Sequence, residues 1–163
     1  MNLPFASNTS AGTGSLTMHR RSVIAVAARY LGALAVLAIG VDHLEQYAVD
    51  NYSTVPTIGT LFFLNFVSAV LIAVGLILPV RRAMGRYGDA FRAVIALGGI
   101  GLAVLSLAGL FVSEATGLFG FVEHGYRMAI VLAIAAEVAA LVLLVIFLAA
   151  SGTGVEKIRA DAR

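Results

Sequence analysis

The sequence predicts an all-α membrane protein in which four transmembrane helices pack as a bundle. Of its 163 residues, 60% are apolar and only 12% are charged, and the mean hydropathy is +0.97. Soluble domains average about 45–50% apolar and about 25% charged residues. A domain of this size keeps too much surface in contact with its surroundings to hide so many apolar side chains from water. We therefore expect lipid to surround most of the chain.

Four apolar runs are each long enough to cross a hydrocarbon core of about 30 Å, which takes roughly 20 helical residues. They cover residues 22–41, 57–80, 93–112 and 128–150. Helices are favoured over strands because the runs are continuously apolar, whereas a barrel strand alternates and needs many more partners to close. The sequence thus predicts one transmembrane domain over residues 22–150.

The two ends of the chain have a different composition. Residues 1–21 are rich in Ser, Thr, Asn and Gly, and we expect a disordered cytoplasmic tail there. The first apolar run is followed by Asp42 and His43 without a small-residue cleavage pattern, so we expect it to remain as a signal anchor. Residues 151–163 are predicted to form a second solvated cytoplasmic tail.

Basic residues predict the orientation, because Lys and Arg close to transmembrane helices accumulate on the cytoplasmic side. Nine of them precede the first run, join the second run to the third, or follow the fourth: Arg20, Arg21, Arg81, Arg82, Arg86, Arg92, Lys157, Arg159 and Arg163. The other side holds Arg127 alone. Both termini should therefore be cytoplasmic. Ten Arg to one Lys is typical of a GC-rich bacterial genome and favours a bacterial inner membrane. The net charge of +2 gives no reason to expect a nucleic-acid partner.

Small residues recur at helical spacing within three of the runs. They are Ala25, Ala28, Gly32 and Ala35 in the first, Ala96, Gly99, Ala103, Ser106 and Gly109 in the third, and Ala129, Ala133, Ala136 and Ala140 in the fourth. Such stripes let membrane helices approach closely, and we expect them to form a compact four-helix bundle. A homo-oligomer is a possible assembly of the chain. No internal repeat of the kind common in transporters is evident.

Three polar residues lie at membrane depth in the predicted helices: Arg29, Asn65 and Glu137. From the predicted helix ends, Arg29 is about 10 Å from the cytoplasmic edge and Glu137 about 14 Å from the outer edge. In a core of about 30 Å, their heights then differ by roughly 5 Å. We expect a buried ion pair between them. The alternative is that Arg29 extends to the cytoplasmic headgroups and Glu137 is protonated.

A second group of polar residues is expected at the outer ends of the helices: Asp42, His43, Glu45, Glu114, Glu123 and His124. The sequence has no Cys, which excludes thiol chemistry, iron–sulfur ligation by Cys and covalent c-type haem attachment. His43 and His124 are nevertheless candidate ligands for haem iron or a metal, and His124 with Met128 for copper. The alternative is an ordinary polar cap at the membrane interface.

Two stretches of the first helix, Arg29–Gly32 and Gly40–Leu44, resemble the opening of DoxX-like membrane proteins. Pro56, Asn65 and Gly75 resemble the second-helix pattern of that family, although the family commonly has a glutamate where Asn65 stands. The resemblance covers roughly the first half of the membrane region. It implies a small four-helix inner-membrane protein, and some relatives are subunits associated with sulfur or quinone oxidoreductases and oxidative-stress complexes.

Three functional hypotheses follow. The first is a non-catalytic anchor or accessory subunit of a redox or stress-response assembly, with membrane oxidoreductase subunits as partners and quinone as a possible ligand. The second is an electron carrier that holds haem or a metal at His43 and His124 on the outer face. The third is a protein that moves protons or a small solute past Asn65 and Glu137. The short loops hold no hydrolase triad and no phosphate-binding motif, so hydrolase and kinase activities are not expected.

Overall fold

The computed structural model describes residues 9–122 and 128–151 and is all-α over these residues. Four long helices make up the bundle: α1 (Thr9–Ala48), α2 (Ile58–Ile77), α4 (Gly88–Ala115) and α5 (Met128–Ala150). Three short elements connect them: η1 (Tyr52–Thr54), α3 (Val80–Met84) and η2 (Gly85–Tyr87). All four long helices contain a segment that is long and apolar enough to cross a membrane. The predicted fold class is confirmed.

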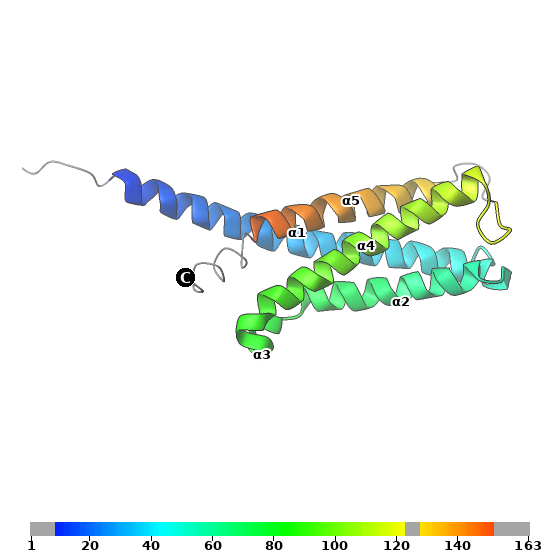
Figure 1. Cartoon of the computed structure of the whole chain (residues 1–163), viewed down its shortest axis with the longest axis horizontal. Coiled ribbons are helices and arrows are strands. Elements are labelled where there is room, and N and C mark those ends of the chain that lie inside the picture. Colours follow the sequence, from blue (N-terminus) through cyan, green and yellow to red (C-terminus); the bar gives the residue numbers. More distant parts are fainter. Residues whose placement is uncertain (1–8, 123–127, 152–163) are drawn as a thin grey trace, which may run out of the picture.

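Helix α1 is longer than the apolar run from which it was predicted (Figure 1). It begins at Thr9, so residues 9–21, which were expected to belong to a tail, are helical, whereas residues 1–8 lie outside the described part of the chain. Extending an existing helix by one residue costs much less free energy than nucleating a new one. This explains how the helix continues through a polar sequence, and its first turns project beyond the bundle in Figure 1.

The other helix ends differ less from the prediction. Helix α2 stops at Ile77, and Leu78 has an extended ψ of 145°, because the residue before a proline is biased away from helical geometry. Helix α4 begins at Gly88, upstream of the predicted residue 93. Helix α5 has the predicted bounds.

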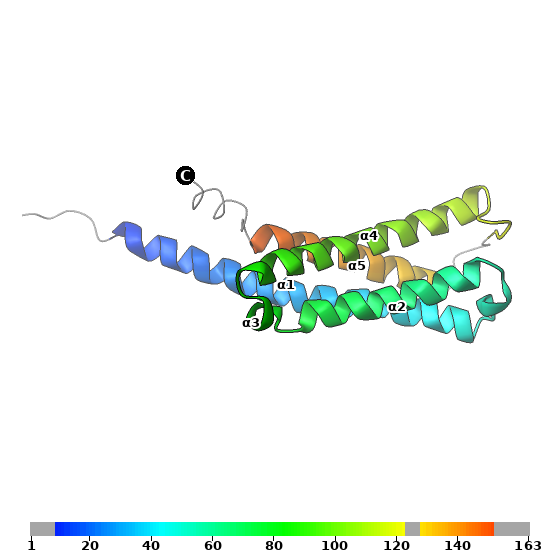
Figure 2. The ribbon, with the colours of Figure 1, turned by 60° about the horizontal axis from the view of Figure 1, so that its bottom comes forward.

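The four helices run alternately up and down (Figures 1 and 2). Helix α1 packs against α2 and α5, and α4 packs against the same two helices, so α1 and α4 are diagonal partners with few mutual contacts. The start of α1, the short helix α3 and the end of α5 lie at one end of the bundle, and η1 lies at the other (Figure 1). The arginine-rich segments of α1 and α3 are thus on one side.

Small residues lie at the helix contacts, as predicted. A Cβ atom added to Gly32 of α1 would lie 2.8 Å from Cδ2 of Leu144, and one added to Gly99 of α4 would lie 2.7 Å from its Cδ1. The side chain of Leu144, which is fully buried, therefore fills the space that two glycines leave on α1 and α4. Close backbone approach of this kind is a main source of stability between membrane helices.

Candidate functional site

Four polar side chains from four different helices lie within about one helical turn of one height in the bundle. Gly40 of α1 faces Phe66 and Ala69 of α2; because the two helices are antiparallel, His43 is level with Asn65. Gly99 of α4 faces Leu144 of α5.

Moving two turns along each of these antiparallel helices places Ser106 level with Glu137. We call His43, Asn65, Ser106 and Glu137 the polar layer.

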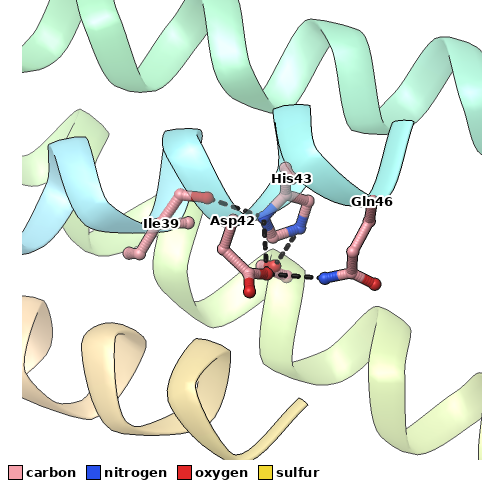
Figure 3. A network of polar contacts seen from close by, with 5 residues as sticks. Ile39, Asp42, His43 and Gln46 are labelled. Carbon is pink, nitrogen blue, oxygen red and sulfur yellow. Dashed lines mark hydrogen bonds and ion pairs between the residues drawn. The ribbon is translucent and has the colours of Figure 1, made fainter. Parts of the chain in front are cut away.

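His43 joins the two diagonal helices through this layer (Figure 3). Its Nδ1 lies 2.9 Å from the carbonyl oxygen of Ile39. A carbonyl oxygen only accepts hydrogen bonds, so Nδ1 donates and Nε2 is the acceptor. The hydroxyl of Ser106 on α4 lies 3.1 Å from Nε2 and donates to it. Both ring nitrogens of His43, a residue that is only 7% exposed, thus have partners within the protein.

Polar neighbours on α1 extend the layer toward the end of the helix. The amide nitrogen of Gln46 donates to Oδ2 of Asp42 over 2.6 Å, and the same oxygen lies 3.9 Å from Nδ1 of His43. Gln46 is buried. The rings of His43 and Phe62 of α2 meet in a T-shaped arrangement at a centroid distance of 5.1 Å, which restricts the orientation of the imidazole.

Two polar atoms of the layer lack a hydrogen-bond partner among the described residues: Oε2 of Glu137 and Oδ1 of Asn65. Glu137 is 2% exposed, and its carboxyl group contacts Ser106. Leaving a buried polar atom unsatisfied costs about 1–3 kcal/mol, and such atoms in native proteins call for an explanation. A bound molecule that supplies the missing partners is one.

Asn65 and Glu137, the residues that carry these two atoms, line a cavity of about 330 Å³. This volume is within the range of about 300–1,000 Å³ common for ligand pockets. The polar layer provides one wall. The other walls are mainly apolar and come from α2, α4, α5 and the turn after α4, and include Ile58, Phe62, Leu102, Leu110, Leu118, Phe121 and Ile130. An apolar pocket with a few converging polar groups is the usual form of a small-molecule site.

The cavity opens sideways between α2 and α4. Leu64 of α2 and Leu105 of α4 line it, yet they are 52% and 73% exposed on the outer surface of the bundle. In a bilayer these surfaces of α2 and α4 face hydrocarbon. A molecule dissolved in the membrane would therefore reach the cavity without crossing water.

Aromatic rings close the cavity toward the η1 end of the bundle. The buried ring of Tyr52 packs against Phe62 at a centroid distance of 5.0 Å and against Phe121 at 5.3 Å. A Cβ atom at Gly59 would lie 2.5 Å from the carbonyl oxygen of Tyr52, so only glycine lets η1 approach α2 this closely. The rings therefore form an aromatic cap, which we define as Tyr52, Phe62 and Phe121.

The structure brings together two of the three polar residues predicted at membrane depth, but not the third. Arg29 is 9% exposed, and its guanidinium carbon lies 4.4 Å from the centroid of the Tyr30 ring. The expected ion pair between Arg29 and Glu137 is absent from the contacts of the described residues. This prediction was wrong because of the relative heights of the two helices. Gly32 of α1 faces Leu144 of α5, so in the antiparallel pair Glu137 is level with Ile39. Ile39 lies ten residues, or about 15 Å, beyond Arg29 along α1.

The predicted outer group is also arranged differently. Asp42, His43 and Glu45 do not follow the first helix but belong to it, and His43 points into the bundle. Glu114 lies in the last turn of α4. Glu123 and His124 are outside the described residues.

The metal and haem hypotheses depended on His43, His124 and Met128. Met128 begins α5 and is 73% exposed. No cluster of three or more His, Cys, Asp or Glu residues able to hold a metal occurs in the described ranges 9–122 and 128–151. A haem or copper site at these residues is still a prediction, and it requires His43 to give up at least one of its present partners.

The sequence analysis did not single out Ser106 or Gln46 as functional residues. Ser106 was counted among the small packing residues, although its hydroxyl bridges α1, α4 and α5. The available signal was a hydroxyl group within an otherwise apolar stripe. Gln46 follows Asp42 by one helical turn, a spacing that places both side chains on one face.

Comparisons with known proteins add no relatives. No protein-family profile, no curated protein and no solved structure matches the chain. The DoxX-like resemblance stays a prediction.

Proposed function

We propose that this multi-pass membrane protein binds a lipophilic small molecule, which it takes from the bilayer into the cavity between α2 and α4. The observation that carries the proposal is Oε2 of Glu137, a buried carboxyl oxygen without a hydrogen-bond partner among the described residues, on a side chain that lines a mainly apolar cavity. Ionisable side chains inside a membrane are costly and commonly mark functional sites.

The two parts of the cavity suit the two parts of an amphipathic ligand. Apolar walls at Leu102, Leu110 and Ile130 would bury its apolar body. The polar layer would orient its head, because Oε2 of Glu137 and Oδ1 of Asn65 are both hydrogen-bond acceptors. A head that donates hydrogen bonds is therefore favoured over one that only accepts them.

This binding role agrees with the first hypothesis from the sequence. In a bacterial inner membrane, a non-catalytic accessory subunit of a redox or stress-response assembly would hold a lipid-soluble molecule for a partner enzyme. Among quinones, the acceptor atoms of the polar layer favour the reduced form, whose hydroxyls donate hydrogen bonds. We assign no reaction to the residues of the cavity.

Filling the cavity tests the proposal. Gly109 lines it, and a Cβ atom there would meet only Cδ2 of Leu118, at an ordinary 3.8 Å. Gly109→Leu should therefore occupy the cavity without disrupting a helix contact. Gly101→Leu is the matched control, because Gly101 is on the same helix and a Cβ atom there meets nothing within 4 Å.

The measurement is native mass spectrometry of the full chain in a mild detergent with the neutral apolar probe diphenylhexatriene. We expect one bound probe on the wild type and on Gly101→Leu, and little or none on Gly109→Leu. Equal binding by all three proteins, or no binding by the wild type, would overturn the proposal.

A further inference from the structure

We infer that the head group recognised at the polar layer is an organic cation, a protonated or quaternary amine attached to an apolar body, and that the carboxylate of Glu137 holds it. This inference rests on the proposed function and names the chemical class of the ligand. It is argued from the charges, hydrogen-bond donors and rings that the described residues place around the cavity.

Acidic groups, and no Lys or Arg, are found near the layer in the described helices. Its one basic group is the imidazole of His43, whose Nε2 accepts a hydrogen bond and therefore carries no proton. Helix α1 contains no Lys or Arg between Arg29 and its end, and α4 contains none between Arg92 and its end. Helices α2 and α5 contain no Lys or Arg at all. Glu137 is almost fully buried. A charge buried in a medium of low dielectric needs a partner of opposite sign, and a cationic ligand would supply one.

The hydrogen-bonding groups point the same way. Three donors in or beside the layer are already engaged: Nδ1 of His43 donates to Ile39, Ser106 to His43, and Gln46 to Asp42. The atoms without a partner among the described residues, Oε2 of Glu137 and Oδ1 of Asn65, are acceptors. An ammonium group carries positive charge and, when protonated, donates hydrogen bonds to such atoms. The oxygen atoms of an anionic head only accept hydrogen bonds, so they could not bond to these two acceptors.

The aromatic cap adds a second attraction for a cation. Phe62 and Phe121 both line the cavity, and Tyr52 packs against each of them. The faces of aromatic rings attract ammonium groups, and quaternary amines are the ligands most often recognised in this way. Rings and a carboxylate in one cavity are thus complementary to such a head.

An inorganic cation fits the cavity less well. Calcium requires six to eight oxygen ligands, and magnesium requires a nearly ideal octahedral set. The cavity is lined mainly by apolar side chains, which cannot replace a hydration shell. Those same walls can bury the apolar body of an organic cation, which favours an organic ligand.

Three probes with the same diphenylhexatriene body test this inference: one with a trimethylammonium group, one without a head, and one with a propionate group. Native mass spectrometry would measure their binding to the full-length wild type, to Glu137→Gln and to Asp89→Asn. Asp89 is the matched control, because its side chain is 60% exposed and it does not line the cavity. Both substitutions remove one carboxylate and keep a similar shape.

We expect the wild type and Asp89→Asn to prefer the cationic probe over the neutral one by about tenfold or more, as for a charge-assisted contact in a buried site. Glu137→Gln should bind both probes equally. If the wild type binds the neutral and cationic probes equally, or if Glu137→Gln keeps the preference, the inference fails while the proposed function stands. If none of the probes binds the wild type, both fail. If Glu137→Gln does not fold, the inference is still tested by the wild type alone, through its binding of the cationic probe relative to the neutral and anionic probes.

Discussion

At the scale of single residues, Ser106 has an unusual position because its one hydroxyl group contacts side chains of two other helices. It donates to Nε2 of His43 on α1 and contacts the carboxyl group of Glu137 on α5. We expect Ser106→Ala to destabilise the folded protein by about 1 kcal/mol, since the buried Nε2 of His43 would lose its donor. Thermal unfolding in a mild detergent would show this as a lower Tm.

Ser53→Ala is the control for this prediction. Ser53 is exposed in η1, so the same loss of a hydroxyl group should leave the Tm unchanged. Equal Tm values for the two variants would show that the contact between Ser106 and His43 contributes nothing measurable to stability.

The residues of the site could be predicted better than their pairing. Asn65 and Glu137 were identifiable because a polar side chain inside an apolar run is costly. Their partners depend on the heights of the helices relative to one another, which an apolar run does not define. The contact of Gly99 with Leu144 places Ser106 beside Glu137. This contact between α4 and α5 cannot be predicted from the sequence of either helix alone.

At the scale of helices, close approach at glycine determines how α1 and α2 pack. A Cβ atom added to Gly40 would lie 2.8 Å from the Cβ of Ala69 and 3.4 Å from the carbonyl oxygen of Phe66. Neither atom can move unless α2 itself shifts. We expect Gly40→Ala to destabilise the bundle by about 1–3 kcal/mol through overpacking, measured as a lower Tm in detergent.

Gly101→Ala is the comparison, because a Cβ atom at Gly101 meets nothing within 4 Å. This variant should unfold at the wild-type Tm. The proposed role of Gly40 would be wrong if both variants, which add the same methyl group, had the wild-type Tm.

The ends of the helices were predictable where composition changes sharply, as at Met128 and Ala150 of α5. They were not predictable where polar residues continue a helix. Asp42, His43 and Gln46 look like the start of a loop in the sequence, yet helix α1 continues to Ala48. His43 and Gln46 are buried against the neighbouring helices, so they need no solvent, and an analysis of apolar runs alone ends the helix too early.

At the scale of the whole molecule, the polar layer divides the bundle unequally. Asn65 lies seven residues after the first residue of α2 and twelve before its last, or about 10 Å and about 18 Å along the helix axis. The cavity is therefore close to the η1 end, and the leaflet from which a ligand enters depends on which side of the membrane that end faces. The predicted orientation, with arginines inside, assigns the cavity to the outer leaflet.

The absence of cysteine from the chain makes this orientation directly testable, because a single introduced thiol is the only one that can react. Ser53 in η1 and Ala83 in α3 are both exposed and lie at opposite ends of the bundle (Figure 1). In intact bacterial cells, a membrane-impermeant maleimide should label Ser53→Cys, and Ala83→Cys should be labelled only after permeabilisation. The reverse pattern would place the η1 end inside the cell, and the cavity would then draw its ligand from the inner leaflet.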